Sequence, residues 1–187
     1  MASVSSIDVV SIEHSVFIRH AEPLIEPDRP SSMWSLSPQG RIESRRLGES
    51  LTSQNVQRIF TSSEKKAHET ALIISEELDV EVVVDERLRE VDRPWIHQRF
   101  SNAVIEYLRG VSVDGWEPAS QVIERFTAAL TDHLPKGPSA IVTHGTALSC
   151  FLGSRALAKA DTFWENLVMP DAWRLTRDGL VRLSYQS

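Results

Sequence analysis

The sequence predicts an α/β protein: a single-domain, three-layer α/β/α sandwich with a mostly parallel central sheet and an antiparallel edge. Short apolar runs alternate with segments of helical periodicity, as in βαβ units, and two extended runs flank a turn near the end of the chain. The 187 residues are 41% hydrophobic and 25% charged, a globular composition that is long enough to bury one core. We therefore expect one domain over residues 1–187.

Three strands and two helices are predicted in the first half of the chain. The strands are the apolar runs at residues 15–18, 58–61 and 80–84. Ser37 and Pro38 supply an N-cap and a first-turn proline for a helix that runs to about Thr52. Ser63 is the expected N-cap of the next helix, whose apolar positions recur at helical spacing: Ala67, Ala71, Ile74 and Leu78.

The second half begins with an irregular stretch. We interpret residues 85–117 as an inserted, lid-like segment that contains one helix around Phe100, Val104 and Leu108. The later elements are predicted as a helix with Val122, Phe126, Leu130 and Leu134 on one face, a strand at 139–142, and a hairpin of 172–176 and 180–183 around Arg177-Asp178-Gly179. This hairpin should form the antiparallel edge of the sheet.

Charge and cysteine content exclude several classes of protein. The net charge of −6 argues against a nucleic-acid partner, because a phosphate backbone needs an excess of Lys and Arg. The single cysteine, Cys150, permits no internal disulfide or cysteine-based zinc site, so we expect a cytoplasmic protein. Residues 1–14 carry neither a signal peptide nor a membrane anchor, and we interpret them as a loosely ordered or edge-strand extension.

Two histidines follow two of the predicted strands directly. Arg19 and His20 come at the end of the first strand, and His144 comes at the end of the strand at 139–142. Open α/β sheets build their active sites at the carboxyl ends of strands. A His beside an Arg, with a second His from far along the chain, suits the handling of a phosphoryl group better than it suits packing.

The order of several short motifs is more specific. They are residues 19–22 (RHAE), 36–40 (LSPQG), 61–71 (TSSEKKAHETA), 88–90 (LRE) and 143–145 (THG). In this order they resemble the histidine phosphatase superfamily, the phosphoglycerate mutase-like proteins, over roughly Val16 to Leu152. The resemblance implies that His20 is the nucleophile that becomes phosphorylated, that Arg19, Lys66 and His144 bind the phosphate, and that Glu90 gives and takes the proton.

Physical chemistry supports these roles. A phosphomonoester is doubly charged, so its attack by a nucleophile needs cations and alignment. Arg19 is a rigid bidentate donor, and Lys66 lies in the first turn of a helix, where an anion is already favoured. His20 should be neutral, with its second ring nitrogen bonded to an acceptor, and burial should raise the pKa of Glu90 toward neutrality. With this cationic cage, formed by Arg19, Lys66 and His144, we expect no cofactor and no metal.

Other residues have weaker claims. Asp85, Glu86, Asp92 and Glu117 are alternatives to Glu90 as the proton donor, and Glu117 is also a candidate for a supporting role. The remaining histidines, His14, His68, His97 and His133, are predicted to lie at the surface. Trp34, Trp95 and Trp116 fit either a pocket lining or half-buried packing, and Cys150 fits an inert core position.

Three departures from the family pattern refine the prediction. Ala21 stands where the family usually has Gly, Lys66 stands where it has a second Arg, and residues 23–28 lack the Asn and Gly-Arg pattern of sugar-acid mutases. We predict a metal-independent phosphomonoester hydrolase that acts on a phosphorylated small molecule or a phosphoprotein, with no nucleic-acid or membrane partner. The alternatives are a phosphoglycerate-type mutase and a catalytically weak phospholigand-binding regulatory protein, which Lys66 would favour.

Overall fold

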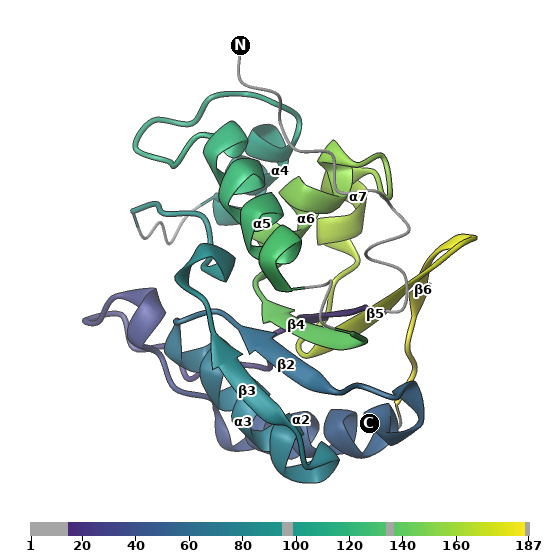
Figure 1. Ribbon diagram of the computed structural model, residues 1–187. Helices are drawn as coiled ribbons and strands as arrows, with labels where there is room; N and C mark the ends of the chain where they lie inside the picture. Colours follow the sequence, from purple (N-terminus) through teal and green to yellow (C-terminus); the bar gives the residue numbers. More distant parts are fainter. Residues whose placement is uncertain (1–14, 95–98, 134–136, 186–187) are drawn as a thin grey trace.

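A six-stranded sheet forms the centre of the computed structural model, which describes residues 15–94, 99–133 and 137–185 (Figure 1). The strands are β1 Val16–Arg19, β2 Arg58–Thr61, β3 Glu81–Val84, β4 Ser139–Thr143, β5 Asp171–Thr176 and β6 Gly179–Arg182. Their order across the sheet is β3-β2-β4-β1-β5-β6. The first four are parallel, and β5 and β6 are antiparallel. The predicted fold class is therefore confirmed.

Helices cover both faces of this sheet. They are α2 Pro38–Leu51, α3 Lys65–Leu78, α4 Phe100–Leu108, α5 Ala119–His133, α6 Gly145–Ser154 and α7 Ala160–Glu165, with short 3-10 turns η1 Ser31–Met33, η2 Thr52–Gln54 and η3 Glu86–Leu88. Helices α2 and α3 pack on one face, and α4 to α7 lie on the other (Figure 1). Because both faces are covered, the central strands β1, β2 and β4 are largely apolar and buried.

The alternation of side chains along β1 produces two cores. Val16 and Ile18 pack with Leu47 of α2 and Ile74 of α3. Phe17 points to the opposite face and packs in the cluster formed by α5 and α6. All five side chains are buried. This two-sided packing fixes the register of β1 and hence the position of the residues that follow it.

The starts of α2 and α3 differ from each other. Ser37 caps α2 as predicted, and its Oγ accepts the Gly40 N–H at 2.9 Å. The predicted N-cap of α3 at Ser63 is wrong, because Glu64 is the N-cap residue and its side chain does not cap the helix. The Oγ of Ser62 instead accepts the Glu64 N–H at 3.1 Å. Ser62, one residue before the predicted cap, therefore stabilises the start of the helix. The Glu64 carboxylate is left available for other contacts.

His133 corrects the prediction of a surface position. Its side chain is buried, its Nε2 lies 2.7 Å from a carboxylate oxygen of Asp85, and its ring stacks on Phe60 with centroids 4.0 Å apart. It occupies the inward face of α5, where the apolar period of the helix continues to its last residue. Cys150 is buried in α6, as predicted. His14, His97, Trp95 and Leu134 lie outside the described residues.

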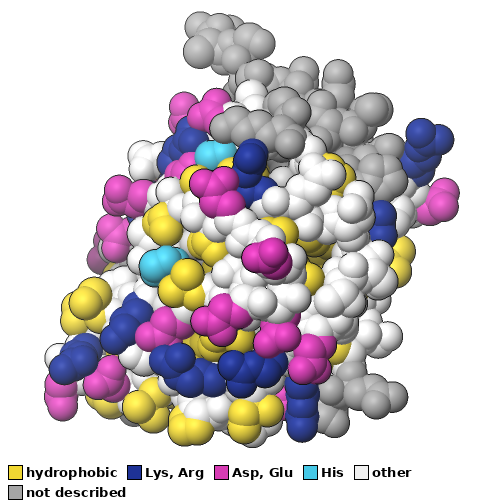
Figure 2. All heavy atoms as spheres, turned by 60° about the horizontal axis from the view of Figure 1, so that its bottom comes forward, with side chains coloured by type: hydrophobic (Ala, Val, Ile, Leu, Met, Phe, Trp, Pro, Cys, Tyr) yellow, Lys and Arg dark blue, Asp and Glu magenta, His cyan; other side chains and the backbone are white. Residues whose placement is uncertain are grey.

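The outer face of α2 and α3 is charged but mixed in sign. Figure 2, which turns this side of the molecule forward, shows Lys and Arg side chains interspersed with Asp and Glu. Arg41 pairs with Glu69, and Arg45 pairs with Glu77, in both cases between the two helices. Within the described part of the chain, no helix combines the length and the apolar character needed to cross a bilayer.

Candidate active site

Two imidazoles meet where β1 and β4 end. These parallel strands pair with Arg19 opposite Thr143, and the His20 N–H donates to the Thr143 carbonyl at 3.0 Å. His20 and His144 therefore leave adjacent strands at the same level, and their ring centroids are 5.0 Å apart. Both side chains are buried. The sheet itself thus brings together two residues that are far apart in the sequence.

The His20 imidazole is held in one tautomer. Its Nδ1 lies 2.7 Å from the Ala21 carbonyl oxygen, and since a carbonyl only accepts, Nδ1 carries the proton. Burial lowers the pKa of His20 well below the ordinary value, and the neighbouring His144, Lys66 and Arg19 lower it further. The ring is therefore neutral with a free lone pair on Nε2, the form that a nucleophile requires.

Arg19 places a guanidinium beside the start of α6. Burial lowers its pKa from the ordinary value, whereas Glu90 and Asp171 act to raise it. One of its terminal nitrogens donates to the Leu167 carbonyl at 3.2 Å, and Nε is buried without a hydrogen-bond partner. A Cβ on Gly145 would lie 3.3 Å from this Nε, so glycine keeps the helix start clear of the side chain. Arg19 thus retains donor capacity for an anion.

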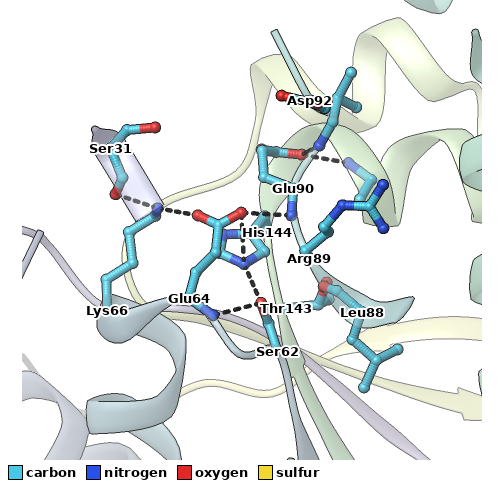
Figure 3. A network of polar contacts seen from close by, with 12 residues as sticks. Ser31, Ser62, Glu64, Lys66, Leu88, Arg89, Glu90, Asp92, Thr143 and His144 are labelled. Atoms are coloured by element: carbon cyan, nitrogen blue, oxygen red, sulfur yellow. Dashed lines mark hydrogen bonds and ion pairs between the residues drawn. The ribbon is translucent and has the colours of Figure 1, made fainter. Parts of the chain in front are cut away.

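Lys66 supplies a second cation from the first turn of α3. Its side chain is buried, and its ammonium donates to the Ser31 carbonyl at 2.8 Å and forms an ion pair with Glu64 (Figure 3). The cation lies where the helix N-terminus also favours negative charge. The position in the first turn is as predicted, but the ion pair with Glu64 is not.

Glu64 is a residue that the sequence analysis missed. Figure 3 shows its carboxylate between Lys66 on one side and Glu90 and His144 on the other. One oxygen accepts the Glu90 N–H at 2.8 Å and lies 3.8 Å from His144 Nε2, which also contacts the Ser62 Oγ at 2.8 Å. The cage therefore contains an internal negative charge. A glutamate two positions before Lys66 was the only signal in the sequence.

The carboxylate of Glu90 lies against the N-terminus of α6. It accepts the backbone N–H groups of Ala147 at 2.8 Å, Thr146 at 3.2 Å and Val91 at 3.0 Å. Burial acts to raise its pKa, but His144, Arg93 and the Val91 hydrogen bond outweigh burial, and the pKa falls below the ordinary value. The expectation of a raised pKa is thus wrong, because the Val91 hydrogen bond and the neighbouring His144 and Arg93 side chains stabilise the ionised form.

The segment that carries Glu90 is held from outside. The Arg125 guanidinium, from α5, donates to the carbonyls of Arg87, Arg89 and Glu90 at 2.7, 2.8 and 3.0 Å, and it forms an ion pair with Glu117. Glu117 also accepts the Asp92 N–H at 3.1 Å. Glu117 therefore has a supporting role in holding the loop.

The acidic neighbours of Glu90 in the sequence are placed differently. Asp85 is bonded to Arg87 and His133, and its pKa falls to about 2, since the hydrogen bonds from these partners outweigh the effect of its burial. Asp92 and Glu86 are exposed. Among the acids considered from the sequence, Glu90 has its carboxylate beside the two imidazoles and the cage.

A cavity of about 290 Å³ joins these groups. Arg19, His20, Lys66 and Glu90 line it, and His144 lies buried beside His20. Its remaining walls are largely apolar and aromatic, formed by Pro23, Ile25, Trp34, Phe100, Trp164 and Met169. Of the tryptophans considered from the sequence, Trp34 lines this cavity and Trp116 is buried.

Arg93 is a further wall residue that the sequence analysis missed. Its guanidinium lies 4.3 Å from the Phe100 ring centroid and 5.2 Å from that of Trp116, and its Nε is buried without a hydrogen-bond partner. Stacking on two rings holds this cation beside Glu90. An Arg within a loop gave no pattern from which this position could be inferred.

The comparisons with known proteins agree with this geometry. The model of the histidine phosphatase superfamily (branch 1) matches residues 15–176, and the chain belongs to this superfamily. The resemblance inferred from the ordered motifs is confirmed.

Within the described residues, no group of three or more His, Cys, Asp or Glu side chains is arranged to hold a metal ion.

Curated relatives include proteins described as mutases. The "probable phosphoglycerate mutase GpmB" of Serratia proteamaculans is 29% identical over 154 residues, which cover 73% of this chain and 72% of the relative. The protein of the same name from Klebsiella pneumoniae is 28% identical over 159 residues, with the same coverage.

Solved structures share the fold. A mycobacterial glucosyl-3-phosphoglycerate phosphatase in complex with inorganic phosphate superposes with a TM-score of 0.68 and 18% identity, covering 92% of this chain and 96% of that one. Bacillus stearothermophilus YhfR gives a TM-score of 0.67 and 19% identity with the same coverage. At these identities the likeness establishes the architecture, and the chemistry must be argued from the site.

Proposed function

We propose that this protein is a phosphomonoester hydrolase that works through a phosphorylated His20. The observation that carries the proposal is a buried, neutral imidazole whose Nε2 is free and which is flanked by Arg19, Lys66 and His144. Two neighbouring cations, Arg19 and Lys66, do not stabilise a histidine that has only a structural role. They do stabilise the phosphate dianion that a nucleophilic histidine attacks.

The reaction divides hydrolysis into two steps. In the first, His20 Nε2 forms a bond to phosphorus while the bond from phosphorus to the ester oxygen breaks, and Glu90 protonates the departing oxygen. In the second, Glu90 takes a proton from water, the water oxygen attacks phosphorus, and the bond to Nε2 breaks to release phosphate and regenerate the imidazole. Arg19, Lys66 and His144 stabilise the charge on the phosphoryl oxygens throughout.

Glu90 must be protonated when the ester bond breaks. Its pKa is low without substrate, but a phosphate dianion in the cavity that it shares with His20 adds negative charge nearby and raises the pKa. Substrate binding itself would thus prepare the proton donor. This coupling is the physical account that we offer for an acid with a depressed pKa.

We further propose that the reaction needs no divalent metal, because Arg19 and Lys66 supply the positive charge that a metal ion supplies in other phosphoryl transferases. The substrate class is a phosphorylated small molecule or a phosphoprotein in the cytoplasm. The aromatic walls of the cavity and Arg93 are positioned to contact the leaving group.

Rapid-quench labelling tests the proposal directly. Wild type mixed with a ³²P-labelled phosphomonoester and EDTA should carry one acid-labile, base-stable phosphoryl group per chain, and His20→Ala should carry none. His68→Ala is a matched control, since His68 lies on α3 and does not line the cavity. Hydrolysis without label in wild type, or equal labelling of His20→Ala, would contradict the phosphohistidine mechanism.

Two alternatives have observations in their favour. The names of the curated relatives favour a phosphoglycerate-type mutase, for which phosphoglycerate interconversion should depend on 2,3-bisphosphoglycerate. The ion pair between Lys66 and Glu64 favours a weak phospholigand-binding regulator, which should bind phosphate without turnover of p-nitrophenyl phosphate. The hydrolase proposal predicts turnover that is independent of the bisphosphate.

A further inference from the structure

The Glu64 carboxylate is a charged group beside the cage that the proposed reaction does not use. Its side chain is 11% exposed, and it pairs with Lys66, a residue that we assign to the phosphate dianion. One of its oxygens is paired with the Lys66 ammonium, and the other accepts the Glu90 N–H (Figure 3). Burial of a carboxylate is costly unless it is paired, so these contacts determine where it stays.

The carboxylate also lies close to the second histidine of the cage. Its Oε1 is 3.8 Å from His144 Nε2, on the side where that nitrogen contacts Ser62. Lys66 and His144 are two of the groups assigned to the phosphate. Glu64 therefore contacts one phosphate-binding donor and approaches another.

We propose that Glu64 is an internal counter-charge that competes with the phosphate anion for Lys66 and keeps the affinity of the site for phosphate low. The inference rests on the proposed function, because it assigns Lys66 to the phosphate. Glu64 is a specificity-determining residue on this account. A phosphate group alone binds weakly, and a substrate must gain binding free energy from contacts of its leaving group with Trp34, Phe100, Trp164 or Arg93.

The geometry sets the expected size of the effect. A unit negative charge a few ångströms from a bound dianion opposes binding strongly even at the effective dielectric constant of a protein surface. Freeing Lys66 from its ion pair adds to the gain. We expect that removal of the charge at Glu64 increases phosphate affinity by about tenfold or more.

Calorimetric titration with inorganic phosphate tests the inference without relying on turnover. Glu64→Gln keeps the shape of the side chain, and its amide oxygen still accepts the Glu90 N–H, so this variant should bind phosphate about tenfold or more tightly than wild type. Glu64→Asp keeps the charge and should stay near wild type. Glu86→Gln is the matched control, because Glu86 is an exposed acid that lines, together with Glu64 and Glu90, a cavity beside the site, and this variant should leave phosphate affinity unchanged.

A second background separates competition for Lys66 from a general charge effect. In Lys66→Ala, the ammonium is absent and there is nothing to compete for, so the additional change Glu64→Gln should give a clearly smaller gain than in wild type. An equal gain in phosphate affinity in wild type and in Lys66→Ala would overturn the proposal that Glu64 competes with phosphate for Lys66. Thermal unfolding confirms that each variant is folded, and Glu64→Leu serves as a second uncharged variant if the Gln variant is not.

The outcomes for the inference and for the proposed function are distinct. Equal phosphate affinity in wild type and Glu64→Gln would overturn the inference and leave the phosphatase proposal standing. A failure of phosphate to bind wild type and every Glu64 variant would overturn both. Tighter binding in Glu64→Gln, absent from Glu64→Asp and Glu86→Gln, would establish Glu64 as the residue that limits phosphate affinity.

Discussion

The two sides of the cavity are built in different ways. On one side, His20 and His144 follow directly from the ends of the paired strands β1 and β4. On the other side, Glu90 lies in a segment that is neither helix nor strand. Arg125 holds this segment by donating hydrogen bonds to its backbone carbonyl groups. The strand-end side is placed by the packing of the whole sheet, whereas the acid side is held by individual hydrogen bonds, among them those of its backbone with the Arg125 guanidinium and the Glu64 carboxylate. The comparison teaches that the nucleophile and the proton donor should respond differently to substitution.

The largest effect should come from the strand-end side. His20→Ala removes the nucleophile, so kcat should fall by about 10⁴-fold or more, as for other covalent catalysts. The fold should persist, because β1 is held by its neighbours and by both cores and not by the imidazole. Steady-state kinetics measure the fall in kcat, and thermal unfolding shows whether the fold persists. Substantial turnover in a folded His20→Ala would show that the strand-end side does not carry the nucleophile.

The next effect concerns the chemistry of the acid side. Glu90→Gln removes the proton donor, and general acid catalysis is typically worth about 10²–10⁴-fold. The loss should be small for p-nitrophenyl phosphate, whose leaving group needs little protonation, and large for an alkyl phosphate. Kinetics on both substrates measure the difference. An equal loss on both would give Glu90 a structural role at the start of α6.

A smaller effect should follow when the support of the acid side is removed. Arg125→Ala takes the donors from three carbonyls and leaves Arg89 as the remaining ion-pair partner of Glu117. We expect a loss of about 1–3 kcal/mol in stability and a kcat that is about tenfold to hundredfold lower. Phosphate affinity should change less than kcat, because the hydrogen bonds of Arg125 go to the Glu90 segment and to Glu117 and not to Arg19 or Lys66.

The control for this variant is Arg155→Ala, which removes a guanidinium that bonds to Thr127 and not to the Glu90 segment. It should leave kcat near the wild-type value. If Arg125→Ala weakened phosphate binding as much as it lowered kcat, the two sides would not be independent, and the comparison would fail.

The strand-end side and the acid side also differ in how well the sequence predicts them. The strand-end side was predictable because an apolar run places the residues after it, so Arg19, His20 and His144 could be located from two short segments. The βα order and the terminal hairpin were predictable for the same reason. Whether each of these residues performs its assigned step stays a prediction that the experiments above address.

The acid side could not be predicted in the same way. The Glu90 segment is fixed by Arg125, 35 residues away in the sequence, through backbone carbonyls that leave no side-chain pattern. The direction of the Glu90 pKa shift depends on His144 and Arg93, and no local motif places these two groups beside Glu90. The pairing of Glu64 with Lys66 likewise needs the three-dimensional position of the carboxylate.

The smallest effect concerns the stability of the strand-end side at low pH. Burial, followed by the neighbouring charges, lowers the pKa values of His20 and His144 well below 6.5. Below pH of about 6.5 the unfolded chain therefore binds protons that the folded chain does not, and the free energy of unfolding should fall as pH decreases, by up to about 1.4 kcal/mol per pH unit for each imidazole. Above this pH both states are neutral at these rings and the contribution is flat.

Urea unfolding at pH 7.5 and 5.5 checks this dependence on wild type and His20→Gln. The Gln variant has one imidazole fewer to protonate on unfolding, so its stability should fall less between the two pH values. His68→Gln is the control, since His68 lies on α3 away from the two imidazoles, and it should keep the full wild-type difference. An identical loss in wild type and His20→Gln would mean that the His20 ring accepts a proton in the folded protein, which would remove the neutral nucleophile from the strand-end side.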